Sequence, residues 1–529
     1  MKTDETAWDA MTIPRTLARA AALWPNAMAV EDGDVRFTFE QLASEVERAA
    51  RACLAAGIER GDRVGIWAPN SWAWEVAALA LQSVGAVLVT LNTRFKAHEA
   101  AYVLGKSRAR LLFTVGDFLG MNYAETIAGE KLPQLERVIA LAGAGKNAQL
   151  WSEFIATGEG VSAATARERA ASVTPDDLSD ILFTSGTTGF PKGVMTAHGQ
   201  NLRVFDAWSG RGLGLRAGDR YLIVNPYFHA FGYKAGWLSC LIRGATALPH
   251  AVFDVPAVLA RVGRERISVL PGPPTLYQSI LAHPDRNNYD LSCLRLAATG
   301  AAAVPVEMVR RMKSELGFET VITAYGLTES CGTVSLCTPG DDPETIANTC
   351  GKALDGTEVK CVRADGSEAA RGEPGEVWVR GYNVMRGYFE DAAETAKAID
   401  KGGWLHTGDI AVMDARGYLR ITDRIKDMYI YGGFNCYPAE IENLIYKHPG
   451  IAQVAVIGVP HERQGEIGMA FVVPAPGATI EPDELVKWCR ANMANYKVPG
   501  SVRIVSALPL NASGKVLKTE LRTMAATSA

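Results

Sequence analysis

The first third of the chain alternates amphipathic helical segments with short apolar runs, and this alternation limits the folds open to it. Apolar residues recur there at helical spacing or form runs of strand length, and the same order returns later in the chain. The segments are helices over 39–55 and 71–84 and strands over 63–67, 86–90, 268–270, 295–299 and 321–323. Such alternation builds largely parallel sheets covered by helices. We therefore predict an α/β fold.

The sequence pattern changes after Gly372, where short strand-like runs are separated by glycine-rich turns. This pattern predicts a β-rich subdomain with strands over 375–380, 410–414 and 418–422. A small α+β pattern then follows, with helices over 438–447 and 481–492 and strands over 451–459, 468–473 and 502–505. A chain of 529 residues is longer than one hydrophobic core normally supports, so more than one domain is expected. We predict a large domain over 1–425 and a small domain over 426–529.

Composition excludes several classes of protein. A formal net charge of −4 gives no broad cationic field for nucleic acid. The nine cysteines are scattered without a Cys-x-x-Cys pair, which predicts reduced thiols and no zinc site. The apolar stretch 72–89 is interrupted by Glu75, Gln82 and Ser83, so a buried helix and strand are favoured over a membrane span. With no signal-peptide pattern over 1–11, we expect a cytoplasmic protein that binds small molecules.

A phosphate-binding loop is the clearest functional pattern. The strand-like run 181–183 leads into Thr184 and a run of hydroxyl residues and glycines that ends at Lys192 and Gly193. Glycines let backbone N–H groups approach an anion, hydroxyls donate hydrogen bonds, and a lysine adds charge. The spacing differs from a Walker P-loop, because Lys192 follows Pro191 and precedes Gly193 in place of Ser or Thr. The composition alone predicts an anion cradle, and its spacing disfavours a P-loop kinase.

The loop Thr-Ser-Gly-Thr-Thr-Gly-Phe-Pro-Lys-Gly over 184–193 resembles the signature of the adenylate-forming superfamily of acyl-CoA synthetases, luciferases and peptide-synthetase adenylation domains. Five further segments match that family in the same order: 299–305, 324–330, 403–409, 423–427 and 508–518. The resemblance implies a ligase that joins a small-molecule carboxylic acid to CoA through an acyl adenylate, with ATP and Mg²⁺. Attack on the α-phosphate needs positioning, a cation and positive charge rather than a nucleophilic side chain.

The resemblance also implies a nucleotide site. The loop would enclose the β- and γ-phosphates, Thr184 and Glu329 would hold Mg²⁺, and Asp409 would bind the ribose. Lys515 would bind the carboxylate and the α-phosphate as a catalytic residue. The implied ATP- and AMP-binding residues are Thr184, Ser185, Gly186, Thr187, Thr188, Gly189, Lys192, Gly300, Ala301, Ala302, Tyr325, Gly326, Thr328, Asp409, Arg424 and Lys515. Structural alternatives are a surface carboxylate at Glu329, a turn cap at Asp409 and a solvated lysine at Lys515.

By the same resemblance the small domain is mobile and rotates about a hinge at Lys426 between the two half-reactions. Gly432, Gly433 and Phe434 would then face the site and leave room for the pantetheine of CoA. Many relatives carry glutamate where this chain has Phe434, so a role built on that glutamate does not transfer. The sequence leaves the oligomeric state open, and a homodimer is compatible with it.

The acid-binding wall is expected in the stretch 225–237, with His229 as a gate between the acyl site and the thiol channel. The expected acyl-binding residues are His229, Phe231, Tyr233, Lys234 and Trp237. Their aromatic rings favour a broad apolar pocket and a ring-bearing acid. Lys234 is expected either to donate to a ketone of that acid or to be a solvated loop residue.

Stretches outside the shared motifs resemble the actinobacterial ligases of steroid degradation, which act on 3-(7a-methyl-1,5-dioxo-octahydroinden-4-yl)propanoate. A medium-chain fatty or aryl acid is the alternative substrate. Two other readings are a carrier-loading or luciferase-like adenylate former and a non-catalytic nucleotide-binding module. The joint presence of Thr184, Lys192, Glu329, Asp409 and Lys515 speaks against the non-catalytic module.

Overall fold

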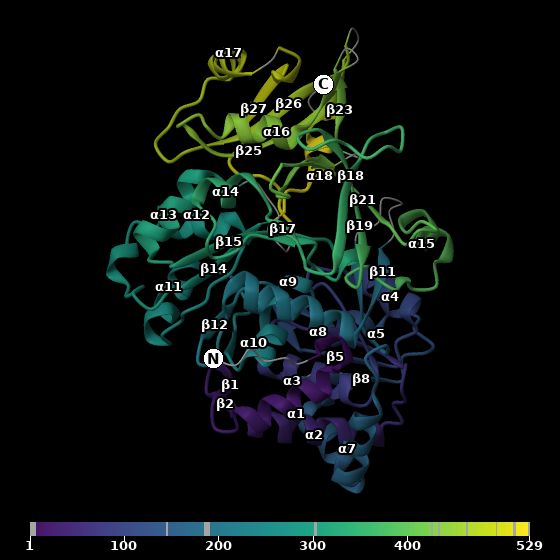
Figure 1. Ribbon diagram of the computed structural model, residues 1–529. Coiled ribbons are helices and arrows are strands. Elements are labelled where there is room, and N and C mark those ends of the chain that lie inside the picture. The colour runs from purple at the N-terminus through teal and green to yellow at the C-terminus, as the bar shows by residue number, and fades with distance from the viewer. Residues whose placement is uncertain are drawn as a thin grey trace.

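A computed structural model describes most of the chain, and Figure 1 shows the order of its helices and strands. The residues described are 7–143, 147–184, 191–300, 304–424, 427–431, 434–461, 464–493, 495–511 and 515–526. Among them the α-helices are α1 (Ile13–Leu23), α2 (Phe39–Ala55), α3 (Trp72–Ser83), α4 (Ala97–Ser107), α5 (Tyr123–Ala128), α6 (Trp151–Thr157), α7 (Ala163–Ser172), α8 (His198–Ala207), α9 (Ala230–Gly232), α10 (Ser239–Arg243), α11 (Val255–Arg264), α12 (Pro274–Ala282), α13 (Val306–Leu316), α14 (Pro343–Asn348), α15 (Ala392–Ala398), α16 (Pro438–Ile445), α17 (Pro482–Asn492) and α18 (Lys518–Ala526).

An eight-stranded sheet carries the phosphate-loop strand. Its order is β20 (Gly387–Tyr388), β11 (Lys192–Ala197), β10 (Leu178–Thr184), β4 (Val87–Thr90), β3 (Arg63–Trp67), β5 (Leu111–Thr114), β8 (Arg137–Ala140) and β9 (Gln149–Leu150). The strands from β10 to β9 are parallel, whereas β11 turns back antiparallel beside β10 and pairs with β20. Strands β6 (Asp117–Phe118) and β7 (Met121–Asn122) form a separate hairpin.

Two four-stranded sheets also belong to the large domain. One has the order β12 (Arg220–Ile223), β13 (Thr246–Pro249), β1 (Met28–Asp32) and β2 (Val35–Thr38). The other has the order β14 (Leu296–Gly300), β15 (Thr320–Tyr325), β16 (Ser335–Leu336) and β17 (Lys352–Ala353). The strand expected over 268–270 is reduced to single bridges from Val269 to Tyr221 and to Leu296. Those bridges connect the two sheets.

Local signals explain where the first long helices begin. In α2 the Thr38 hydroxyl accepts from the Gln41 N–H, and the Gln41 side chain accepts from the Thr38 N–H, which completes a capping box. In α3 the Ser71 hydroxyl caps the first turn by accepting from the Trp74 N–H. Nearly every residue of α3 is buried, so this helix lies inside the domain, as predicted for the apolar stretch 72–89.

The β-rich subdomain and the C-terminal segment follow. The subdomain is an antiparallel sheet of β18 (Thr357–Val362), β19 (Pro374–Gly381), β21 (Leu405–Met413) and β22 (Leu419–Arg424). The C-terminal sheet contains β24 (Phe434–Cys436), β23 (Tyr429–Tyr431), β26 (Gly465–Pro474), β25 (Ile451–His461) and β27 (Ser501–Ile504). Figure 1 shows these last elements gathered at one end of the molecule.

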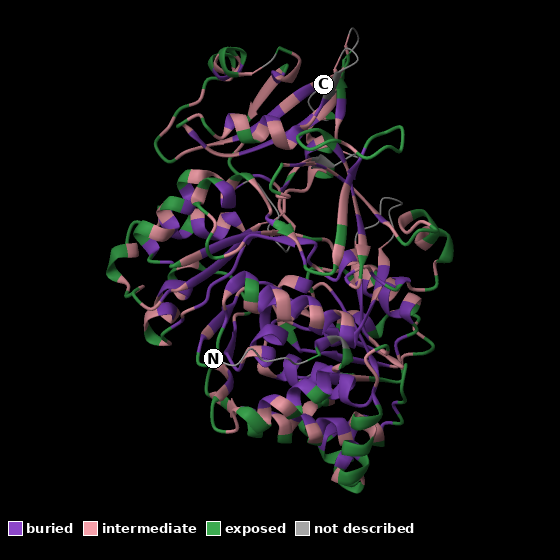
Figure 2. Cartoon of the chain, in the orientation of Figure 1, coloured by how far each residue is buried: buried purple, intermediate pink, exposed green. Residues whose placement is uncertain are grey.

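Buried side chains divide between the two parts of the chain. Figure 2 shows buried residues along the inner strands and exposed residues at the outer helices and loops. Two hydrophobic clusters use only residues from 8 to 421, and two others use only residues from 429 to 525. The C-terminal segment therefore has its own core. The boundary at 426 and the mobility of the small domain stay predictions.

The fold agrees with the predicted α/β class, and most predicted elements differ by only a few residues at their ends. The nine cysteines are free thiols, seven of them buried and two half-buried. None of the helices in the described residues has both the length and the apolar character that a bilayer crossing requires.

One buried histidine makes the stability of the fold depend on pH. The Nδ1 atom of His198, in the first turn of α8, accepts a hydrogen bond from the Ile13 N–H at the start of α1. Burial lowers the pKa of His198 from 6.5 to about 4, so the ring is neutral at pH 7. Protonation would remove the acceptor that joins α8 to α1.

Because the folded pKa is depressed, stability is fully present above pH 6.5 and is lost as the pH falls towards 4. We expect His198 to lower the free energy of unfolding by about 2 kcal/mol between pH 7 and pH 5. Urea unfolding of the wild-type protein and of His198→Asn, which keeps an acceptor oxygen, measures this difference. Equal pH dependence in the two proteins would contradict the assignment.

Candidate active site

Parallel strand ends bring the predicted nucleotide residues to one edge of the large domain. Thr184 is the last residue of β10 and pairs with Lys192 at the start of β11, so the two bracket the phosphate loop. Gly300 ends β14 and pairs with Ala324, and Tyr325 ends the neighbouring β15. Ligands of α/β sheets bind outside the carboxyl ends of the strands. The predicted Ser185, Gly186, Thr187, Thr188, Gly189, Ala301 and Ala302 lie outside the described residues.

A chain of polar contacts links Lys192 to Glu329. The Lys192 ammonium forms an ion pair with Glu394 in α15 and lies 5.1 Å from the ring centroid of Tyr388. The Tyr388 hydroxyl donates to Glu329 Oε1 at 2.9 Å. The bond from Lys192 holds the pKa of Glu394 at about 2, so Glu394 remains ionised and Lys192 keeps an anionic partner. Lys192, at the end of the phosphate loop, and Glu329 are thus linked by one network.

Asp409 connects the subdomain to the end of β15. Its carboxylate is buried, and Oδ2 accepts a hydrogen bond of 2.6 Å from the Tyr325 hydroxyl. The backbone of Asp409 pairs with that of Arg424 across β21 and β22. Tyr325 precedes Gly326, where a Cβ atom would lie only 2.2 Å from the Gly332 carbonyl oxygen. Glycine is therefore required for the chain to turn from Tyr325 into the 3₁₀ turn that begins at Thr328.

Lys515 reaches the large domain from the C-terminal segment. Its N–H donates to the Asn511 side chain at 2.8 Å, and the Asn511 N–H donates to the Lys515 carbonyl, which closes a tight turn. The charge of Lys515 acts on His229, which caps α9 in the predicted acid-binding wall. The structure thus brings together the predicted lysine and the predicted gate residue, which are far apart in the sequence.

The protonation state of His229 follows from its surroundings. His229 is exposed at the surface. Packing against protein atoms still removes part of the hydration of its ring and lowers its pKa to about 4, and the positive charges of Lys515 and Lys234 lower the pKa further. His229 is therefore neutral at pH 7. Its Nδ1 atom accepts from the Phe231 N–H, so the proton lies on Nε2. In this state His229 can donate from Nε2 but cannot act there as a base.

The predicted acyl-binding residues separate into two layers. His229 is exposed and Phe231 is half-buried, whereas Tyr233 and Trp237 are buried and stack with a centroid distance of 4.8 Å. Tyr233 and Trp237 lie in a π-helix over 233–238. They therefore support the wall from behind, and of the five predicted residues His229 and Phe231 are the accessible ones.

Lys234 differs from its prediction. Its side chain is only 1% exposed, and its ammonium forms a 3.0 Å ion pair with Asp180 and donates to Thr196 at 2.9 Å. Asn201 donates to the other Asp180 oxygen at 2.7 Å. Breaking a buried pair of this kind by removing one partner costs about 3–5 kcal/mol. Lys234 is thus neither a solvated loop residue nor placed to bind a substrate ketone, and this corrects both expectations.

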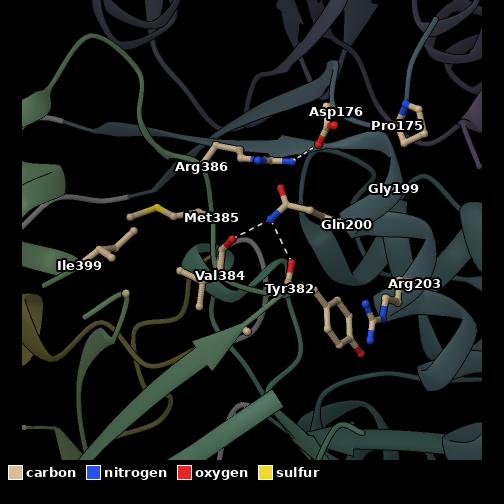
Figure 3. A pocket seen from close by; sticks show the side chains of 12 residues that line it. Pro175, Asp176, Gly199, Gln200, Arg203, Tyr382, Val384, Met385, Arg386 and Ile399 are labelled. Carbon is tan, nitrogen blue, oxygen red and sulfur yellow. Dashed lines mark hydrogen bonds and ion pairs between the residues drawn. The ribbon is translucent and has the colours of Figure 1, made fainter. Parts of the chain in front are cut away.

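A surface cavity of about 500 Å³ lies between α8 and the segment 381–386. In Figure 3 Arg386 points towards Asp176, with which it forms an ion pair, and Arg203 lies over the ring of Tyr382. None of the site residues predicted from the sequence lines it. The cavity touches the site only indirectly, through the bond from the Met385 N–H to the Glu329 carbonyl.

Two residues of the phosphate network were missed by the sequence reasoning. Tyr388 and Glu394 lie about 200 residues after Lys192, and no local motif around them indicates phosphate chemistry.

The residues predicted for the hinge and the CoA channel lie largely outside the part of the chain that the structure describes. Lys426, Gly432 and Gly433 lie outside the described residues, and Phe434 is described only by its backbone, at the start of β24. Their roles stay predictions.

Comparisons with known proteins decide the family. The family model of the AMP-binding enzyme matches residues 17–389, and that of the AMP-binding enzyme C-terminal domain matches residues 440–515. The chain belongs to the AMP-binding enzymes. It is 50% identical to a (7a-methyl-1,5-dioxo-octahydro-1H-inden-4-yl)propanoyl:CoA ligase of Rhodococcus jostii (strain RHA1) over 97% of this chain and 98% of that protein. A ligase of the same name from Mycobacterium tuberculosis (strain H37Rv) is 49% identical over 97% and 99%.

A solved structure supports the same family. The anthranilate CoA ligase AuaEII in complex with anthranoyl-AMP matches with a TM-score of 0.88 and 28% identity, covering 98% of each chain. Among AMP-binding enzymes, then, one that holds an acyl adenylate has the same arrangement of elements from end to end. The predicted adenylate-forming fold of large domain, β-rich subdomain and C-terminal α+β segment is confirmed.

The Asp409–Tyr325 bond gives a test of the nucleotide site in this AMP-binding enzyme. Asp409→Ala removes the buried acceptor, and we expect the KM for ATP to rise more than about tenfold, because a lost charge-assisted bond costs roughly 1.5–3 kcal/mol. Tyr325→Phe keeps the ring and leaves the carboxylate, so its KM for ATP should change less than about threefold. Pyrophosphate release measures both. Equal effects of the two variants would contradict a direct role of Asp409.

Proposed function

We propose that the chain attaches CoA to 3-(7a-methyl-1,5-dioxo-octahydroinden-4-yl)propanoate, a ring-bearing acid of steroid C/D-ring degradation. The chain is an acid–CoA ligase of the AMP-forming kind. The observation that carries the substrate proposal is the identity of 50% and 49%, over nearly the full length, to two ligases named for that acyl group. The accessible layer of His229 and Phe231 over buried aromatic rings fits an apolar ring system.

The first half-reaction joins the acid to ATP. A carboxylate oxygen of the acid attacks the α-phosphorus, an acyl–O–P bond forms, and the bond to pyrophosphate breaks. We assign Lys515 to the carboxylate and the α-phosphate, because its charge already acts beside His229 at the wall. We assign the loop and Lys192 to the departing pyrophosphate and Asp409 to the ribose. Thr328, beside Glu329 in the 3₁₀ turn, is assigned to the α-phosphate.

The residues proposed to hold Mg²⁺ fit that ion. Thr184 and Glu329 offer oxygen atoms, and Tyr388 occupies only Oε1 of Glu329. Three or more His, Cys, Asp or Glu residues grouped as a metal site do not occur in the described part of the chain. This fits a cation held partly by phosphate oxygens of ATP, which would neutralise charge on those oxygens when bound.

The second half-reaction transfers the acyl group to CoA. The thiolate of CoA attacks the acyl carbonyl carbon, the C–S bond forms, and AMP leaves with the oxygen. The charge of Lys515 acts on the gate residue His229, and in our proposal the thiol must later approach the same acyl carbonyl carbon. A rotation of the small domain about Lys426 that removes Lys515 is therefore part of the proposal, with Gly432, Gly433 and Phe434 turned towards the channel.

A panel of acids tests the substrate. We expect CoA-thioester formation with the indanedione propanoate to exceed that with octanoate or benzoate by at least about a hundredfold in kcat/KM, because a shape-matched ring system buries much more apolar area. AMP release measured with each acid gives the comparison. Preference for octanoate would favour the medium-chain alternative, and preference for benzoate the aryl alternative.

Separate half-reactions test the role of Lys515. Lys515→Ala should abolish pyrophosphate exchange, since the positive charge on the α-phosphate is lost, while thioester formation from preformed acyl adenylate stays largely intact. Lys518→Ala, in the same C-terminal segment but paired with Glu442, is the matched control and should leave both steps active. Equal loss of both steps in Lys515→Ala would contradict the assignment.

A further inference from the structure

A buried carboxyl group lies directly behind the acid-binding wall. Glu75, in the first turn of α3, is 2% exposed, and its Oε1 atom accepts a 2.5 Å hydrogen bond from the hydroxyl of Tyr227, which is fully buried. Tyr227 is two residues before the gate residue His229. Burying an ionisable group costs free energy unless a partner compensates it, so such a group calls for a role.

In the part of the chain that the structure describes, no cation acts on Glu75. In the described residues, the titratable groups that face it are Tyr227 from the wall loop, Asp32 from the end of β1 and Cys240 from α10. Arg261 faces Asp32 rather than Glu75. Burial raises the pKa of Glu75 to about 8, although the bond from Tyr227 lowers it, and Asp32 raises it further. At neutral pH the carboxyl group is therefore protonated.

The wall loop has little freedom to move independently of Tyr227. The Asn70 side chain accepts from the Tyr227 N–H at 2.8 Å and donates to the carbonyls of Ile223 and Asn225 at 3.1 and 2.9 Å. Within the turn, a Cβ atom at Gly232 would lie 2.3 Å from two carbonyl oxygens. A displacement of Tyr227 must therefore pass along the backbone to His229.

We propose that Glu75 is a positioning residue for the acid-binding wall: protonated, it holds Tyr227 and the loop 225–232 in place, and its ionisation displaces the loop and weakens binding of the acid. An ionised Glu75 would stand in an apolar interior beside Asp32 without a cation. A displaced loop would let water reach the carboxylate, and this gain in hydration must exceed the loss of the hydrogen bond from Tyr227, which favours the ionised form. The inference rests on the proposed acid-activating function.

The test compares Michaelis constants across pH. For the wild-type enzyme we expect the KM for the indanedione propanoate to rise about tenfold from pH 7 to pH 9, because about a tenth of Glu75 stays protonated one pH unit above its midpoint. The KM for ATP should stay constant. Glu75→Gln keeps the acceptor oxygen without a titrating proton, so its KM for the acid should equal the wild-type value at pH 7 and stay flat to pH 9.

A second variant checks the neighbour that raises the midpoint. Asp32→Asn keeps an oxygen for the Trp72 N–H but removes the negative charge beside Glu75, so the midpoint of the KM profile should move to lower pH. A merely structural role of Glu75 would not give this shift. The proposal is overturned if wild type and Glu75→Gln share one profile, if the wild-type KM is flat, or if the KM for ATP rises in parallel.

A measurement without substrate separates this inference from the proposed function. Thermal unfolding of the ligand-free proteins should show the wild-type midpoint falling between pH 7 and pH 9 more steeply than that of Glu75→Gln, since a pKa raised in the folded state loses stability as the pH rises. Equal slopes would overturn the role of Glu75 whichever acid the enzyme prefers. If the panel selects another acid, the KM profiles are measured with that acid.

Discussion

The site depends on the parallel alignment of strands in two separate sheets. Thr184 ends β10 of the eight-stranded sheet, and Gly300 and Tyr325 end the parallel strands β14 and β15 of a second sheet, whereas Asp409 lies within the antiparallel strand β21. The single bridges of Val269 continue the second sheet through to β14. Because the strand ends are fixed by buried ladders, the loops that follow them can carry glycines and hydroxyl groups without loss of position.

The charged side chains of Lys192 and Glu329 already have protein partners in this structure. Glu394 neutralises Lys192, and Tyr388 donates to Glu329, so neither the cation nor the anion of the phosphate network is isolated. If the phosphates of ATP bind at Lys192, as proposed, they would replace Glu394 as its anionic partner, which would lower the net gain in affinity. The hydrogen bond from the Tyr325 hydroxyl similarly fixes the Asp409 carboxylate, which is proposed to bind the ribose of the nucleotide.

The sequence predicted the fold class, the order of elements and the residues that end each strand. Periodicity is a local property, and capping residues such as Thr38 and Ser71 mark helix starts within a few positions. It could not predict Glu394 or Tyr388, because both contact Lys192, which lies about 200 residues earlier in the chain. Lys234 was misjudged for the same reason: its partner Asp180 lies 54 positions away on a neighbouring strand, and no spacing rule connects them. The strand expected at 268–270 is reduced to the bridges from Val269 to Tyr221 in β12 and to Leu296 in β14.

Two buried acidic groups near the predicted acid-binding wall differ in their partners. Asp180 is paired with the Lys234 ammonium, and Thr196 and Asn201 complete its contacts. Glu75 accepts from the Tyr227 hydroxyl, and within the described residues no cation faces it, so burial raises its pKa. In our proposal this second support is the one that titrates. An apolar acid gains its affinity from the fit of rings against that wall, so the support that titrates is the one through which pH can act on binding.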